Sequence, residues 1–141
     1  MTVVRNDRFT LRPASTTTWR RPSNGCATPL QDEGFGVLTE IDGQATLREK
    51  LDIDVAAYRI LGACNPALAH QALEADAAIG SLLPCNVVVR AHPDGGSEII
   101  AADPNAMLGL ADAPDVAPIA RDAAERIQRA VDAAAAAREV R

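Results

Sequence analysis

The stretch YRILGACNP, residues 58–66, predicts a strand that passes directly into a helix. Its first seven residues are mainly apolar, as expected of a strand that is buried in a packed sheet. Asn65 and Pro66 form a strong helix start, because an Asn side chain accepts free backbone amides and Pro at the first helical position loses no hydrogen bond. We expect this helix to run to about residue 76.

Strand and helix signals on either side of this stretch predict the rest of the fold. GFGVLTEI, residues 34–41, reads as a strand entered through a glycine turn, and LLPCNVVVR, residues 82–90, reads as a strand rich in β-branched residues. This order predicts the α+β class, a two-layer sandwich with helices packed on one face of a mainly antiparallel sheet. The other expected elements are strands at residues 9–11 and 97–102 and helices over residues 44–51, 104–110 and 118–137.

The expected helix over residues 44–51 has a cap and an apolar side. Asp42 precedes it and can accept hydrogen bonds from the first free amides. Its apolar residues are Ala45, Leu47 and Leu51, and we expect these side chains to face the core.

Composition indicates one small domain with an aliphatic core. The chain has 141 residues, of which 48% are hydrophobic and only 3% are aromatic. A net charge of −5 argues against a nucleic-acid partner, because phosphate binding needs clustered Lys and Arg. No apolar run approaches the roughly 18 residues of a membrane span, and the polar N-terminus lacks the apolar region of a secretory signal. The odd number of cysteines, three, favours a reducing, cytoplasmic location.

The segment from Pro13 to Pro29 has neither helical nor strand periodicity. One interpretation is a flexible polar loop. The other is a compensated frameshift: with G or C at third codon positions, the neighbouring frame reads LDDDLEAAVERVRDA, an amphipathic helix that would lead into Leu30 and stop at Gly34. Cys26 would then have no functional role. The expected organisation is an N-terminal segment over residues 1–33, irregular at 13–29, followed by a single α+β domain over residues 34–137.

Two Cys-Asn doublets form the main candidate site. Cys64-Asn65 ends one expected strand and Cys85-Asn86 begins the next, so adjacent strands would bring both doublets to one edge of the sheet. We expect the sulfur atoms of Cys64 and Cys85 to lie closer to each other than either lies to Cys26. A pocket bordered by the two doublets is the expected ligand site.

Three interpretations of the thiols remain open at this point. Cys is often buried simply as a small hydrophobic residue. Alternatively, the positive end of the following helix can lower the pKa of Cys64, which would act as a thiolate with His70 as its base. Thiolate and imidazole ligands from Cys64, His70 and Cys85 also suit zinc or copper, with Glu40 or water as a fourth ligand. Against a metal site, the two cysteines are 21 residues apart and do not form a close pair.

The polar residues beside the thiols have simpler explanations. Asn65 is expected to cap the helix, and His70 is expected on the exposed side of that helix. Asn86 has no such local explanation, because Asn is depleted in strands, and it is expected to contact either a loop or a ligand. No nucleophile elbow, glycine-rich phosphate loop or zinc-protease motif occurs, and no motif indicates a cofactor.

Three blocks of the sequence resemble one known family. They are GFGVLTEID, YRILGACNP with Ala69-His70 following, and LLPCNVVVR, and together they are similar to the domain of unknown function 302. The resemblance spans residues 34 to about 127. It implies a compact α+β domain that forms a homodimer, occurs chiefly in bacteria and archaea, and has no assigned activity. The family has a strand and a helix before the first block, where this chain has residues 13–29.

The expected function is that of a homodimeric binding or accessory module for a small-molecule ligand, with no nucleic-acid or membrane partner. Its candidate ligand-binding residues are Cys64, Asn65, His70, Cys85 and Asn86. One alternative is a thiol-dependent enzyme or redox protein that uses Cys64. The other is a purely structural interaction domain.

Overall fold

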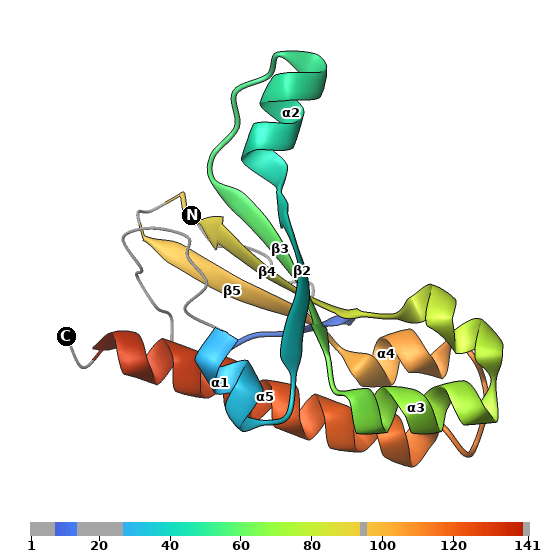
Figure 1. Ribbon diagram of the computed structural model, residues 1–141. Coiled ribbons are helices and arrows are strands. Elements are labelled where there is room, and N and C mark those ends of the chain that lie inside the picture. The colour runs from blue at the N-terminus through green and yellow to red at the C-terminus, as the bar shows by residue number, and fades with distance from the viewer. Residues whose placement is uncertain (1–7, 14–26, 94–95, 140–141) are drawn as a thin grey trace.

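A computed structural model of the chain describes residues 8–13, 27–93 and 96–139, and within these residues five strands form one antiparallel sheet (Figure 1). The strand order is β1-β5-β4-β3-β2, and every neighbouring pair is antiparallel. The strands are β1 (Thr10–Leu11), β2 (Gly36–Asp42), β3 (Tyr58–Cys64), β4 (Cys85–Ala91) and β5 (Ser97–Ala102).

Helices cover one face of this sheet (Figure 1). The longest, α5, runs along that face, and α1, α3 and α4 all contact it. This arrangement confirms the predicted α+β fold. The helices are α1 (Ala27–Asp32), α2 (Gly43–Leu51), α3 (Pro66–Ala75), the short 3₁₀ helix η1 (Ala77–Leu82), α4 (Pro104–Gly109) and α5 (Ala117–Glu139). In the part of the chain that the structure describes, no helix is both long and apolar enough to cross a membrane.

The core is aliphatic, as composition predicts, and forms two clusters. In the larger one, the strand register aligns Leu61, Val87 and Ala101 in a row across the middle of the sheet, where they pack with Ile127 and Val131 of α5. The smaller cluster joins α3, η1, α4 and the first turns of α5. Its buried residues are Ala72, Ile79, Leu108, Val116 and Ala120.

The segment that the sequence predicts to be irregular, residues 13–29, ends in a helix. Residues 27–29 are helical, so the prediction of an irregular segment through Pro29 is wrong at its C-terminal end. The physical reason is Leu30, which is fully buried in the same cluster as Phe35 and anchors α1 against α5. The other residues of the questioned segment, 14–26, include Cys26 and lie outside the described residues.

The β2–α2–β3 region projects from the sheet as an arm (Figure 1). Asp42 caps α2 as predicted, and its Oδ1 accepts a hydrogen bond from the Ala45 amide at 2.9 Å. The predicted inward face is wrong, however, because α2 has no buried residue and Leu51 is 61% exposed. The helix stands beyond the end of the sheet, where no other described element forms a second layer against its apolar side (Figure 1).

Candidate functional site

The β3–β4 pair brings both Cys-Asn doublets to one end of the sheet. β3 ends at Cys64 and β4 begins at Cys85, and the register pairs Cys85 with Ala63, the residue before Cys64. Both cysteines are free and partly buried. Both also line one cavity of about 30 Å³ whose other walls include the apolar side chains of Leu68 and Leu83. The structure therefore places the two thiols together.

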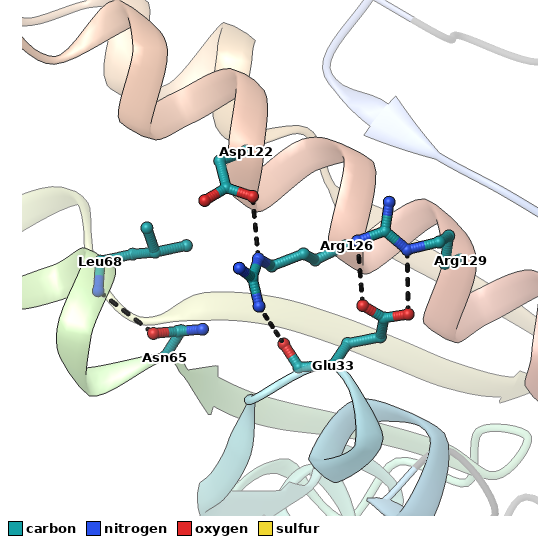
Figure 2. Close-up of polar contacts among 6 residues, drawn as sticks. All are labelled: Glu33, Asn65, Leu68, Asp122, Arg126 and Arg129. Carbon is teal, nitrogen blue, oxygen red and sulfur yellow. Dashed lines mark hydrogen bonds and ion pairs between the residues drawn. The ribbon is translucent and has the colours of Figure 1, made fainter.

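Asn65 closes the end of this cavity and begins α3. Its Oδ1 accepts a hydrogen bond from the Leu68 amide at 3.1 Å, which is the expected helix-capping contact (Figure 2). The side chain is almost fully buried, with 9% of the residue exposed. Its amide nitrogen faces Gly34, on the chain that leaves α1. Asn65 therefore joins the start of α3 to the end of α1.

A polar cluster on α5 holds this end of α1 in place (Figure 2). The Arg129 guanidinium donates two hydrogen bonds to the Glu33 carboxylate, at 2.9 and 3.1 Å. Arg126 donates to Asp122 at 2.8 Å and to the Glu33 carbonyl at 3.5 Å. The pKa of Glu33 is lowered, mainly by the hydrogen bond from Arg129 and also by the positive charges of Arg129 and Arg126. Burial acts in the opposite direction but is the weaker effect.

The sequence reasoning missed these residues. The four-residue spacing of Asp122 and Arg126 on one helix predicts an ion pair, so that contact was available from the sequence. The pairing of Glu33 with Arg129 spans 96 residues, and no local pattern indicates it.

Asn86 belongs to a second pocket beside the first. This pocket has a volume of about 130 Å³ and is lined by Asn86 together with Ala102 and Met107. The two pockets share four lining residues, which are Leu83, Pro84, Cys85 and Leu108. The second doublet therefore faces two cavities, one on each side of the start of β4.

His70 lies away from both pockets. Its side chain is 75% exposed, and its Nε2 is 3.6 Å from Glu74 Oε1, one turn further along α3. Neither pocket includes it in its wall. His70 therefore lies apart from the thiols, on the exposed side of α3, as the sequence predicts.

Burial keeps the thiols protonated. It raises the pKa of the Cys64 thiol, and burial together with the neighbouring Cys64 raises the pKa of Cys85 to about 11. The pKa of Cys64 is therefore raised by burial and not lowered as the sequence predicts. Both thiols therefore have pKa values above that of an ordinary cysteine.

The proposed three-residue metal site is not formed. Over residues 8–13, 27–93 and 96–139, no group of three or more His, Cys, Asp or Glu side chains is placed to hold a metal ion. Cys64 and Cys85 lie together, but His70 points to solvent. Glu40, the suggested fourth ligand, pairs with Arg59 at 2.5 Å.

The protein is a small α+β domain, with helices on one face of an antiparallel sheet. Two small pockets lie at the β3–β4 end of this sheet. A family model described as "Domain of unknown function DUF302" matches residues 24–134, and the chain belongs to this family. The crystal structure of an uncharacterized conserved protein DUF302 from Bacillus stearothermophilus is similar, with 28% sequence identity and a TM-score of 0.74. The match covers 87% of this chain and 94% of that one. No curated protein matches the chain.

Proposed function

We propose that this chain is a homodimeric binding module that holds a small ligand beside its two Cys-Asn doublets. The observation that carries the proposal is the wall that the two pockets share, which includes Pro84 and Cys85 together with Leu83 and Leu108. The smaller pocket offers two thiols among apolar side chains, and the larger offers the Asn86 amide beside Met107. Mostly apolar walls with a few placed polar groups are typical of ligand-binding sites, and pockets of this size would hold only a small ligand.

Binding is favoured over thiol catalysis by the state and surroundings of Cys64. A thiol nucleophile needs a lowered pKa or an adjacent base. The pKa of Cys64 is raised, and His70 lies on the solvent side of α3. Cys64 therefore lacks both means of activation among the residues that surround it.

The binding site can be tested by NMR titration of the full chain with a set of small organic fragments. We expect saturable shifts for residues that line the larger pocket, and weaker binding in an Asn86→Leu variant. His70→Ala is the matched control and should bind as the parent does. Fragments that bind only at other surfaces would contradict the proposal.

Thiol labelling distinguishes the binding module from the enzyme. With iodoacetamide near neutral pH, Cys64 and Cys85 should react no faster than an ordinary free thiol, since burial raises the pKa of both. Rapid labelling of Cys64 that His70→Ala slows would instead support the thiol-dependent enzyme.

The homodimer is supported by the projecting arm as well as by the family resemblance. Leu38 is 65% exposed, and Ile41, Leu51 and Ile53 are also largely exposed on the same β2–α2–β3 region. A hollow of about 330 Å³ beside α2 is lined mainly by apolar residues, among them Leu47 and Val55, together with Arg90. This concentration of uncovered apolar side chains is unusual for a small monomer.

Both arginines of the arm pair with carboxylates of the arm. Arg48 contacts Asp54 at 2.6 Å and Asp52 at 3.5 Å, and Arg59 contacts Glu40 at 2.5 Å. β2 is also the last strand in the sheet order, so no described strand pairs with its outer edge. A second copy that approaches by two-fold symmetry would cover the same apolar surface on both chains and could extend the sheet through β2.

A further inference from the structure

We propose that Cys64 and Cys85 form a two-coordinate site for a thiophilic monovalent cation, with copper(I) as the chemical class of ligand. The inference rests on the proposed function, because it assigns a ligand to the smaller of the two pockets. It differs from the three-residue zinc or copper site considered from the sequence, since it needs no imidazole and no carboxylate.

The backbone brings the two sulfur ligands to one cavity. In an antiparallel pair, directly opposed residues lie about 4.5–5.5 Å apart at Cα. Cys85 is opposed to Ala63, and Cys64 is the next and last residue of β3. Side chains alternate between the faces of a strand, so it is the shared cavity wall, and not the register, that brings the two cysteines together. Both cysteines are free, and both line the cavity of about 30 Å³. That space suits one ion or a water molecule, which needs about 10–15 Å³ on this measure, and is too small for an organic ligand.

The donor set selects the class of cation. Soft thiolate ligands favour copper(I), whereas a structural zinc ion requires four ligands. Within the described part of the chain, no third His, Cys, Asp or Glu joins the two thiols. Copper(I) accepts two thiolates in a linear arrangement, so a pair of cysteines is sufficient. The apolar walls, which include Phe35 and Leu68, would keep competing water ligands away.

The negative charge of the copper-loaded site lies beside the positive end of α3. Binding follows Cu⁺ + 2 RSH → [Cu(SR)₂]⁻ + 2 H⁺, in which two S–H bonds break, two Cu–S bonds form, and both protons pass to the buffer. No electron is transferred. The product carries one negative charge beside the start of α3, a ten-residue helix that begins at Pro66. The positive end of a helix dipole stabilises an anion at this position.

The proposal is tested with the reduced full-length chain under anaerobic conditions, by titrating copper(I) against a chromogenic copper(I) chelator. We expect one copper ion per chain, and loss of this binding in both Cys64→Ser and Cys85→Ser. Cys26→Ser is the matched control and should retain full binding. A zinc(II) titration should show no stoichiometric site. Loss of binding in Cys26→Ser, or retention in Cys64→Ser, would overturn the proposal.

A second measurement needs no variant and so does not depend on whether the substituted chains fold. Silver(I), which is also thiophilic and does not change oxidation state here, is bound to the parent protein before alkylation and mass spectrometry. Cys64 and Cys85 should be protected while Cys26 is labelled. Equal labelling of all three with and without silver would contradict the site. If copper and silver fail to bind but fragments still bind beside Asn86, the further inference fails and the proposed binding module stands.

Discussion

The side-chain amide of Asn65 lies directly against Gly34. A Cβ atom at position 34 would come within 2.8 Å of Asn65 Nδ2. Gly34 also has a φ of +84° and ends α1, where its amide donates to the Gln31 carbonyl at 2.9 Å and the Phe35 amide donates to the Leu30 carbonyl at 2.8 Å. This is the hydrogen-bond pattern of a Schellman motif. The chain after α1 and the cap of α3 therefore meet at a point with no room for a side chain.

Replacing Gly34 with Ala should destabilise the protein and disturb the first doublet. The left-handed backbone alone costs about 1–2 kcal/mol for a residue with a Cβ atom. The new methyl group must also displace Asn65 and so weaken the cap of α3. Urea midpoints measure the loss, and Gly36→Ala is the matched control because a Cβ there meets nothing within 4 Å. Equal midpoints for the two variants would contradict the role given to Gly34.

Gly62→Ala should also be destabilising, through a different contact. A Cβ atom at position 62 would lie 2.2 Å from Thr39 Oγ1 and 3.0 Å from Pro84 Cγ. We expect Thr39→Ala to rescue part of the lost stability, because it removes the nearest atom but leaves Pro84 in place. A double-mutant cycle based on urea midpoints measures this coupling. Strictly additive losses would show that the two side chains do not compete for space.

The self-association surface is tested by placing a charge on the arm. Leu38→Asp should convert the expected dimer to a monomer, because a carboxylate would be buried without a partner in the interface. Leu110→Asp is the control, since Leu110 is 72% exposed at the end of α4, away from the arm. Sedimentation velocity at micromolar concentration measures both. A parent protein that is entirely monomeric under these conditions would contradict the homodimer.

The Glu33–Arg129 pair predicts a pH-dependent contribution to stability. Since the folded-state pKa of Glu33 is lowered, its stabilising effect is present above the unfolded-state pKa and is lost as pH falls through the lower folded-state value. Glu33→Gln should therefore be less stable than the parent at pH 7, and the difference in urea midpoint should shrink from about pH 5 downward. Glu49→Gln, on the exposed surface of α2, is the control and should show no such trend. A difference that does not change with pH would rule out the charged pair as its cause.

The neighbouring reading frame gives a prediction about α1. Replacing residues 15–29 with LDDDLEAAVERVRDA would put apolar residues at positions 19, 23 and 26, on the same helical face as Leu30. Each large aliphatic side chain that becomes buried against α5 contributes roughly 1.5–3 kcal/mol, so the urea midpoint should rise. The control carries Gln in place of both valines and should lose most of the gain. An unchanged midpoint would favour the polar-loop interpretation.

Local chemistry accounts for what the sequence predicted well. Asn65-Pro66 and Asp42 specify helix starts through contacts within a few residues, and the observed caps match them. The meeting of Cys64 and Cys85 follows from two strands that are joined by a helix and pair directly.

The predictions that were wrong, and the contacts that were not predicted, depend on distant parts of the chain. The apolar side of α2 indicates burial, but whether a layer is present to cover it is decided by how far β2 and β3 extend. The pairing of Glu33 with Arg129 likewise depends on how α1 packs on α5. At Cys64, burial raises the pKa where the sequence predicts that it is lowered, and burial is a property of the whole fold.

The length of α5 links the two apolar clusters into one cooperative unit. At about 1.5 Å per residue, its 23 residues span about 35 Å. Ala120 packs in the smaller cluster, while Ile127 and Val131 pack in the larger one. Neither cluster can lose its order without uncovering part of the same helix, so local unfolding of one should spread to the other. The helix α2 has no buried residue and adds none to either cluster, so we expect it to open and close while the two clusters stay folded.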